Sequence, residues 1–158
     1  HLQMLRTNRK TKSKMAGGSF AIVASKYNGR YVDAMLRAAK AELLRAGGKV
    51  RVVRVPGAFE IPVVAAKLAR ISTNNLGGII CLGVILRGAT THAQHIGEAV
   101  SDALMQIQIQ SGVPVIHEVL LLENEEQAKA RCLSKTHNRG IEAAQTALEM
   151  ARVMKSLR

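Results

Sequence analysis

Residues that could bind an anion and move a proton gather in the stretch GVILRGATTHAQHIGEAV (83–100). An apolar run ends there in glycine, and an amphipathic helical pattern follows it. Small residues such as Ala89 let a ligand approach the backbone, and the free N–H groups at a helix start attract an anion. Thr90 or Thr91 could cap that helix or bond a phosphate oxygen, and His92 in its first turn would be a titratable group beside the anion. Taken alone, a capped helix with an incidental histidine explains the stretch equally well.

The segment VPGAFEIP (55–62) places an aromatic ring and a carboxylate beside a turn. Pro56-Gly57 favours the turn, so that Phe59 and Glu60 would be held at the edge of a sheet. Glu60 could accept hydrogen bonds from a polyol while Phe59 packs nearby. The alternative is that Phe59 belongs to the core and that Glu60 is an acid interacting with a helix dipole.

The segment SKYNGR (25–30) offers Tyr27 as a stacking surface and Asn28 as a polar partner. Asn-Gly is also an ordinary turn, so the segment is weak evidence by itself. The chain has two tyrosines, two phenylalanines and no tryptophan. Tyr27 and Phe59 both fall in loops where a ligand is expected, which is more than core packing alone predicts.

Four apolar runs rich in β-branched residues predict strands at 19–25, 49–55, 77–86 and 113–122. Helical spacing predicts helices through 32–43, over 61–71, through 96–107, from Asn124 onward, and through 141–151, the first of them ended by Gly47-Gly48. Alternating strands and helices predict a three-layer α/β/α sandwich with a four-stranded parallel sheet, resembling the flavodoxin-like group. Ligands bind such sheets outside the carboxyl ends of the strands, so functional residues are expected just after positions 25, 55, 86 and 117.

The composition indicates one domain over 19–158 that follows a basic arm at 1–18. The formal net charge is +12, and the arm contributes to it through five basic residues with no acid among them: Arg6, Arg9, Lys10, Lys12 and Lys14. We favour a solvated or partner-ordered arm over a nucleic-acid contact, because aromatic stacking platforms are missing.

No apolar run is long enough to span a bilayer, no signal peptide is visible, and Cys81 and Cys132 form no paired framework. A cytoplasmic protein with buried reduced thiols and no membrane association is therefore expected.

Four segments in the right order, VPGAFEIP, LGVILRGATTH, NEEQAKAR and NRGIEAAQTALEM, resemble the lumazine synthase family over about residues 19 to 154. The resemblance implies a transferase of riboflavin biosynthesis that uses no metal and no organic cofactor. Such enzymes condense 5-amino-6-(D-ribitylamino)uracil with 3,4-dihydroxy-2-butanone 4-phosphate to give 6,7-dimethyl-8-ribityllumazine and phosphate.

The resemblance also implies a role for each matching position of this chain. It implies that Tyr27 stacks on the substrate ring, that His92 transfers protons, and that Arg131 binds the butanone phosphate. Its pyrimidine and ribityl contacts fall on Ala58, Phe59, Glu60, Val84, Ile85 and Leu86, and its phosphate loop falls on Ala89 and Thr90. This chain departs from the family pattern at three places. Tyr27 adds a hydroxyl to the stacking ring, and His117-Glu118 stands where the family commonly has a phenylalanine and a glycine. Arg139 replaces the usual lysine near the ribityl chain.

Two other classes of function compete with the enzyme. One is a flavodoxin-like module that binds a flavin or nucleotide without catalysis, and the other is a nucleic-acid-binding protein. A phosphoacceptor receiver domain is disfavoured because no acidic cluster follows the first strand, and a metal at His92 and His95 is disfavoured because no third ligand is in view. Arg131, His92 and Glu60 together favour catalysis.

The resemblance further implies a homo-oligomer built of pentamers, which exist alone, as decamers or as icosahedral shells, with riboflavin synthase as a partner of the assembly. The connection LSKTHNRG (133–140) is short and carries no insertion of the kind that tends to block the shell. The arm would add an edge strand to the neighbouring subunit.

Overall fold

The computed structural model of the chain describes residues 17–72 and 75–158. Its elements in chain order are β1 (Ser19–Ser25), α2 (Gly29–Arg45), β2 (Lys49–Val55), the 3-10 turn η1 (Ala58–Glu60), α3 (Ile61–Ile71), β3 (Leu76–Leu86), α4 (His92–Ser111), β4 (Val115–Leu122), α5 (Glu125–Cys132) and α6 (Arg139–Ser156). The strands and helices expected from the sequence are therefore all present. Almost all of the basic arm lies outside the described residues, so its role as an added strand stays a prediction.

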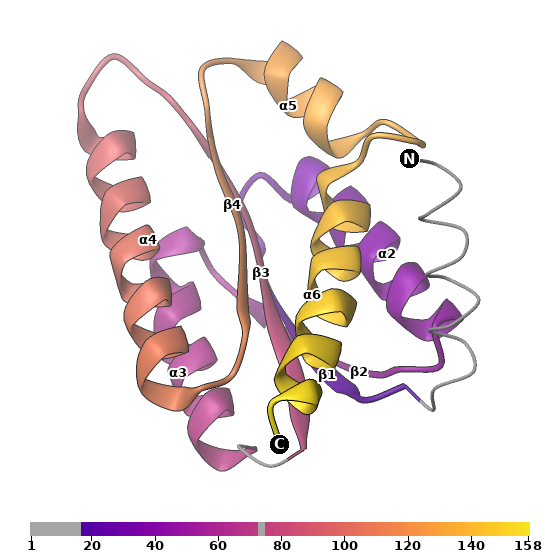
Figure 1. Ribbon diagram of the computed structural model, residues 1–158. Coiled ribbons are helices and arrows are strands. Elements are labelled where there is room, and N and C mark those ends of the chain that lie inside the picture. Colours follow the sequence, from indigo (N-terminus) through magenta and orange to yellow (C-terminus); the bar gives the residue numbers. More distant parts are fainter. Residues whose placement is uncertain (1–16, 73–74) are drawn as a thin grey trace.

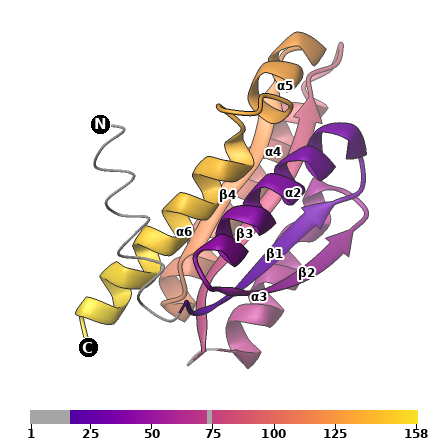
Figure 2. The same ribbon diagram turned by 90° about the vertical axis from the view of Figure 1, so that its right-hand side faces the viewer.

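The strands form one parallel sheet in the order β2-β1-β3-β4. Helices α2 and α6 cover one face and helices α3 and α4 cover the other, and Figures 1 and 2 show these three layers from two sides. Side chains of β1 alternate between the two cores: Ile22 packs with Met35 of α2, and Val23 packs with Ile61 of α3. A parallel sheet buried on both faces explains why the strands are continuously apolar. The predicted three-layer α/β/α fold is confirmed.

Glycines set the end of α2 and the close approach of α6. Gly47 has a φ of 82°, and the N–H of Gly48 donates to the carbonyl of Leu43 at 2.9 Å, which ends the helix as the sequence predicted. At Gly140, near the start of α6, a Cβ atom would lie 2.1 Å from the carbonyl oxygen of Met35. Only glycine lets α6 lie this close to α2.

The fourth strand begins later than the sequence predicted and ends at Leu122 as predicted, and its extent sets the place of His117. It begins at Val115 rather than at position 113, because Pro114 has no N–H to donate to the sheet. It runs on to Leu122, which pairs with Leu86, whereas His117 pairs with Cys81 in the middle of β3. The carboxyl end of β4 is therefore at Leu122. The prediction that functional residues follow position 117 at that end of the sheet is wrong, since His117 lies partway along the strand.

Both cysteines are buried free thiols, as predicted. Burial raises the pKa of Cys81 to about 12 and that of Cys132 to about 11, so neither thiol ionises near neutral pH. Among the helices of the described chain, none is both long and apolar enough to cross a membrane.

Candidate active site

A cavity of about 570 Å³ opens at the carboxyl end of the sheet, between the ends of β1 and β3, the turn η1 and the start of α4. We name it the Tyr27–His92 pocket. It is lined by Tyr27, Asn28, Gly57, Ala58, Phe59, Glu60, Val84, Ile85, Leu86, Gly88, Thr90, His92, Ala93 and Ile96. The structure thus brings together most of the site residues predicted from the sequence. Gly57, Gly88, Ala93 and Ile96 were not predicted; for the last two, the signal was their place on the first turns of the helix that begins at His92.

The aromatic residues divide into two buried and two exposed rings. Phe20 and Tyr31 are only 2% and 3% exposed, whereas Tyr27 is 73% and Phe59 62% exposed. Both exposed rings line the Tyr27–His92 pocket. Because an aromatic ring normally gains from burial, two exposed rings at one cavity indicate a surface that a flat ligand covers.

The loop that carries Tyr27 is held by its backbone. Asn28 adopts the left-handed conformation with a φ of 56°, and its side-chain amide nitrogen donates to the carbonyl of Val84 at 2.7 Å. The N–H groups of Lys26 and Tyr27 donate to the carbonyls of Val55 and Pro56 at 2.7 and 3.0 Å. The amide nitrogen of Asn28 is therefore engaged in joining β1 to β3, which places the ring of Tyr27 beside the η1 turn.

Glu60 closes the η1 turn on itself. Its Oε1 accepts a hydrogen bond from the N–H of Gly57 at 2.9 Å. This bond fixes the carboxylate at the pocket wall, and a carboxylate retains further acceptor positions after one such bond. Glu60 can therefore accept hydrogen bonds from hydroxyl groups of a ligand, as the sequence predicted.

The loop before α4 presents a helix N-terminus to the pocket. Helix α4 begins at His92, has no acid in its first turn, and has Thr91 at the N-cap without a side-chain hydrogen bond. The N–H of His92 lies 3.4 Å from Oγ1 of Thr90, so Thr90 rather than Thr91 faces the helix start. N–H groups in such a position bind an anion. Ala89 belongs to this loop and does not line the pocket.

Arg87, a residue that the sequence reasoning did not assign, ties this loop to two other elements. Its N–H donates to the carbonyl of Leu122 at 2.8 Å, and its Nε lies 3.5 Å from Oε1 of Glu123. Its Nη2 also donates to Oε1 of Gln94 on α4 at 3.2 Å. These contacts join the ends of β3 and β4 to the first turn of α4.

His117 lies outside the pocket, on the α4 side of the sheet edge. Its Nε2 lies 2.7 Å from Oγ of Ser101, and its Nδ1 accepts from the N–H of Val119 at 3.3 Å. A nitrogen that accepts carries no proton, so the geometry fits a neutral ring that donates from Nε2 to Ser101. Partial desolvation against α4 lowers the pKa of His117 as well, which keeps the ring neutral.

Glu118 points to the other face of β4, toward α6. Burial raises the pKa of Glu118 to about 7, with the charge of Arg139 acting against this rise and that of Glu142 adding to it. The charges of Glu118, Arg131 and Arg139 all act on the thiol of Cys132, and Arg139 Nε lies 3.5 Å from a carboxylate oxygen of Glu142. We name His117, Glu118, Arg131 and Arg139 the β4-edge cluster. None of these residues lines the Tyr27–His92 pocket of the same chain.

Helix α5, which carries Arg131, is anchored at its start. Oδ1 of Asn124 accepts from the N–H of Gln127 at 2.9 Å, so the predicted cap is confirmed. The hydroxyl of Tyr31 on α2 donates to Oε1 of Glu125 at 2.6 Å. These bonds fix the position of α5 on α2, and with it that of Arg131.

Comparison with known proteins identifies relatives along nearly the whole chain. The model of the family described as 6,7-dimethyl-8-ribityllumazine synthase matches residues 17–155. Proteins named 6,7-dimethyl-8-ribityllumazine synthase from Xanthomonas oryzae pv. oryzae (strain PXO99A) and Xylella fastidiosa (strain 9a5c) are each 40% identical, over 87% and 90% of this chain and 90% and 93% of their own. The protein of that name from Stenotrophomonas maltophilia (strain R551-3) is 39% identical over 87% of this chain and 90% of its own.

These matches confirm the resemblance found in the sequence, together with the riboflavin pathway and the transferase class that it implied. They extend over both the pocket and the β4-edge cluster, because the matched range includes every residue of each. The chain belongs to the 6,7-dimethyl-8-ribityllumazine synthase family.

Proposed function

We propose that the protein condenses 5-amino-6-(D-ribitylamino)uracil with 3,4-dihydroxy-2-butanone 4-phosphate, and that it releases 6,7-dimethyl-8-ribityllumazine, phosphate and water. The observation that carries this proposal is the Tyr27–His92 pocket. In that pocket an exposed ring, a fixed carboxylate and a histidine at a helix N-terminus line one cavity. The family to which the chain belongs supports the same reaction.

The pyrimidine binds between Tyr27 and the end of β3. Its ring stacks on the exposed face of Tyr27, while Val84, Ile85 and Leu86 line the other wall. The ribityl chain runs along η1, where Glu60 accepts hydrogen bonds from its hydroxyl groups. Phe59 and Ala58 shield the ribityl chain from water. Holding the two substrates side by side supplies much of the rate, since it makes a bimolecular step effectively unimolecular.

The phosphorylated ketone binds at the start of α4. Its phosphate accepts hydrogen bonds from the N–H groups and the Thr90 hydroxyl of the loop that includes Ala89. The amine of the pyrimidine attacks the ketone carbonyl and an imine forms with loss of water; elimination then releases the phosphate, and the ring closes with loss of a second water. His92 accepts and returns protons during these steps, as a general acid and base at the entrance of the cavity.

A cation for the leaving phosphate comes from a second subunit. No arginine or lysine lines the Tyr27–His92 pocket as the described chain forms it, although a leaving phosphate needs cationic stabilisation. In the β4-edge cluster, Arg131 provides that charge, Arg139 lies near the ribityl chain and His117 contacts the pyrimidine. A homo-oligomer in which the β4 edge of one subunit covers the pocket of the next brings the two parts together.

Exposed apolar side chains support such an oligomer. Met105 and Ile109 on α4 are 53% and 70% exposed, and Val63 on α3 is 70% exposed. Exposed apolar residues on neighbouring helices are typical of protein interfaces. We assign the oligomer to a pentamer, assembled into an icosahedral shell in the cytoplasm, with riboflavin synthase as its partner. Hollow particles in electron microscopy support the shell, discrete pentamers or decamers contradict it, and a monomer contradicts the shared site as well.

The reaction itself is tested by mixing both substrates with the protein and following lumazine absorbance and fluorescence. The proposal expects product formation well above the uncatalysed background, and a clear loss in His92→Gln without a change in fold. Folded protein that binds the pyrimidine or a flavin but forms no lumazine above background would establish the non-catalytic module instead.

A further inference from the structure

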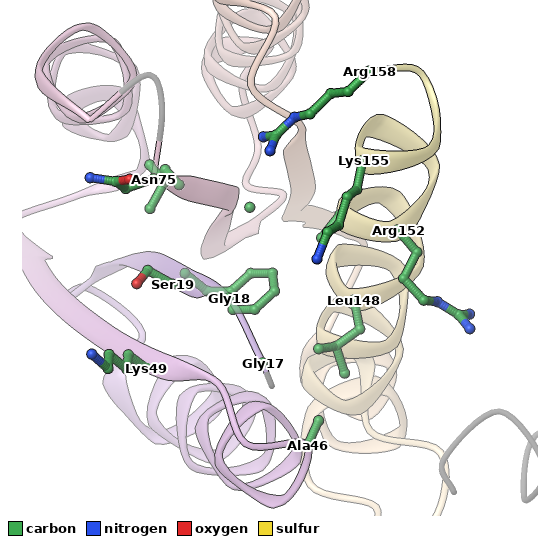
Figure 3. Close-up of a pocket in the computed structure, with 14 residues that line it drawn as sticks. Gly17, Gly18, Ser19, Ala46, Lys49, Asn75, Leu148, Arg152, Lys155 and Arg158 are labelled. Carbon is green, nitrogen blue, oxygen red and sulfur yellow. The ribbon is translucent and has the colours of Figure 1, made fainter. Parts of the chain in front are cut away.

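A second cavity, of about 560 Å³, lies at the amino ends of the strands, opposite the Tyr27–His92 pocket (Figure 3). The starts of β1 and β3 and the last turns of α6 form it, and Figure 1 shows α6 ending beside them. We name it the amino-end pocket. Its volume is close to that of the Tyr27–His92 pocket and falls in the range of small-molecule sites.

The charged side chains that line the amino-end pocket are all cationic: Lys49, Arg152, Lys155 and Arg158. None of the described residues that line it has a carboxylate side chain. Figure 3 shows Lys155 and Arg158 extending from the end of α6 toward the side where Ser19 and Asn75 lie, whereas Arg152 turns away. The wall of the cavity therefore carries an excess of positive charge.

Most of these cations have no acidic partner among the residues that the structure describes. Arg152 forms an ion pair with Glu149. Within residues 17–72 and 75–158, no carboxylate lies at ion-pair distance from Lys49, Lys155 or Arg158. Like charges three residues apart at a helix end repel each other. An anion in the cavity would remove that repulsion.

The helix dipole explains only part of this arrangement. Cations in the last turn of a helix interact favourably with its free carbonyl groups, which accounts for Lys155 and Arg158 near the end of α6. It does not account for Lys49, which begins β2 on another side of the cavity. Charge from two separate elements at one cavity points to a ligand.

The rest of the lining fits an organic body with hydrogen-bond acceptors. Leu76 and Ala151 give the cavity a partly exposed apolar floor, beside the buried Phe20 and Leu148, and Ser19 and Asn75 add a hydroxyl and an amide. The floor is closely packed, since a Cβ at Gly77 would lie 3.1 Å from the Phe20 ring and 3.2 Å from Cβ of Ala151. An apolar surface beside unpaired cations suits an amphiphilic anion better than a bare inorganic ion.

We propose that the amino-end pocket binds a phosphorylated organic molecule, with its phosphate facing Lys155 and Arg158 and its body over Leu76 and Ala151. The chain segment before Gly17 is a poor occupant, because its charged residues are all basic and would add to the repulsion. This site is separate from the Tyr27–His92 pocket and does not rest on the function proposed for that pocket.

ADP is the probe, measured by isothermal titration calorimetry at low salt, with adenosine and pyrophosphate as partial ligands. ADP is expected to bind more tightly than either part. The variant Lys155→Glu/Arg158→Glu is expected to weaken ADP binding by about ten-fold or more, because attraction becomes repulsion at two positions. The control Arg37→Glu/Lys40→Glu makes the same change of charge on the exposed surface of α2 and is expected to leave the affinity unchanged.

Three results would overturn the proposal. They are the absence of saturable ADP binding below about 1 mM, equal weakening in the two charge-reversal variants, and loss of binding in Tyr27→Ala, which would place ADP in the other pocket. The milder variant Lys155→Gln/Arg158→Gln removes the charge without adding acids, and is used if the first variant does not fold by circular dichroism. Lumazine formation, measured in parallel, is expected to persist in every variant of the amino-end pocket.

Discussion

The Tyr27–His92 pocket and the β4-edge cluster, which we propose share one reaction, lie at different places in the fold. The pocket has shape, exposed rings and a helix N-terminus, but its lining has no arginine or lysine. The cluster has Arg131 and Arg139 and forms no part of that pocket. The pocket offers a cavity without arginine or lysine among its described lining residues, and the cluster offers arginines without a cavity. This difference is what the proposed site between two subunits would explain.

The two regions also differ in how they are held. Bonds from side chains to the backbone fix the pocket, since the amide of Asn28 donates to the carbonyl of Val84 and Glu60 accepts from the N–H of Gly57. Side-chain contacts fix the β4-edge cluster, as in the His117–Ser101 and Tyr31–Glu125 pairs. Substitution of either partner in such a pair should therefore change the geometry of the cluster.

The largest effect is expected from Arg131→Ala. Loss of the cation that faces the leaving phosphate should cost about 2–4 kcal/mol, or about 30- to 1000-fold in kcat/KM. Most of the loss should appear as a higher KM for the phosphorylated ketone, with a smaller change for the pyrimidine. Steady-state kinetics with each substrate varied in turn measure the two values. Lys129→Ala on the exposed side of the same helix is the control, and equal changes in both KM values would make Arg131 structural.

Co-assembly of Arg131→Ala with Tyr27→Ala subunits tests whether the two regions meet between chains. If each site combines one pocket with a neighbour's Arg131, some sites in the mixture contain both native residues, and activity exceeds the mean of the two parent variants. Activity equal to that mean places both residues in the same subunit's site.

Tyr27→Ala should have the next largest effect, confined to the pocket. Removing the stacked ring should weaken binding of the pyrimidine and of the product by about 1–3 kcal/mol, the range for base–aromatic stacking. Fluorescence titration with the lumazine product measures the change. Tyr27→Phe keeps the ring and should be nearly neutral; a loss as large as that of alanine would assign the role to the hydroxyl.

Sequence patterns predicted the pocket better than the cluster, for a physical reason. The pocket is made of loops that follow strands, and the ends of β1, β2 and β3 can be found from apolar runs bounded by Asn28-Gly29, Pro56-Gly57 and Gly88. The position of His117 depends on the length and register of β4. The apolar run predicted where the strand ends, but it leaves the register undefined, because the strand is buried on both sides of the histidine.

Sequence patterns could not predict the environment of Glu118 either, because distant parts of the chain create it. A glutamate in a β-branched run predicts an exposed position on an edge strand, but α6 packs over this one and brings Arg139 and Glu142 near it. Contacts between residues far apart in the chain decide its protonation. The cap at Asn124 was predictable, because it depends only on residues three positions apart.

Glu118→Gln should change how stability depends on pH. Burial raises the pKa of Glu118 from 4.5 to about 7, so the folded protein binds this proton more tightly than the unfolded chain does. The free energy of unfolding should therefore fall as the pH rises from 4.5 through 7, by about 1–2 kcal/mol after allowance for solvent screening. Glutamine does not titrate, so the variant should lose less stability than the native protein when the pH rises from 5 to 8.

Denaturation of both proteins at pH 5 and pH 8 measures this difference in stability. The protein concentration is kept fixed, because the stability of an oligomer depends on it. Glu126→Gln, an exposed carboxylate on α5, is the control and should follow the native profile. A native profile in Glu118→Gln would mean that Glu118 is ionised throughout, with Arg139 rather than burial setting its protonation.

The smallest effect is expected from Asn124→Ala, which removes the N-cap of α5 and touches neither region directly. The bond from the Gln127 N–H to Asn124 Oδ1 is lost, at a cost of about 1 kcal/mol in the free energy of unfolding. Since α5 carries Arg131, looser packing of this helix should raise the KM for the phosphorylated ketone slightly and leave product binding in the pocket unchanged. Asn124→Asp keeps the capping oxygen and should restore both values. An equal loss of affinity for the ketone and the product would show that the two regions respond as one unit, contrary to the division between them.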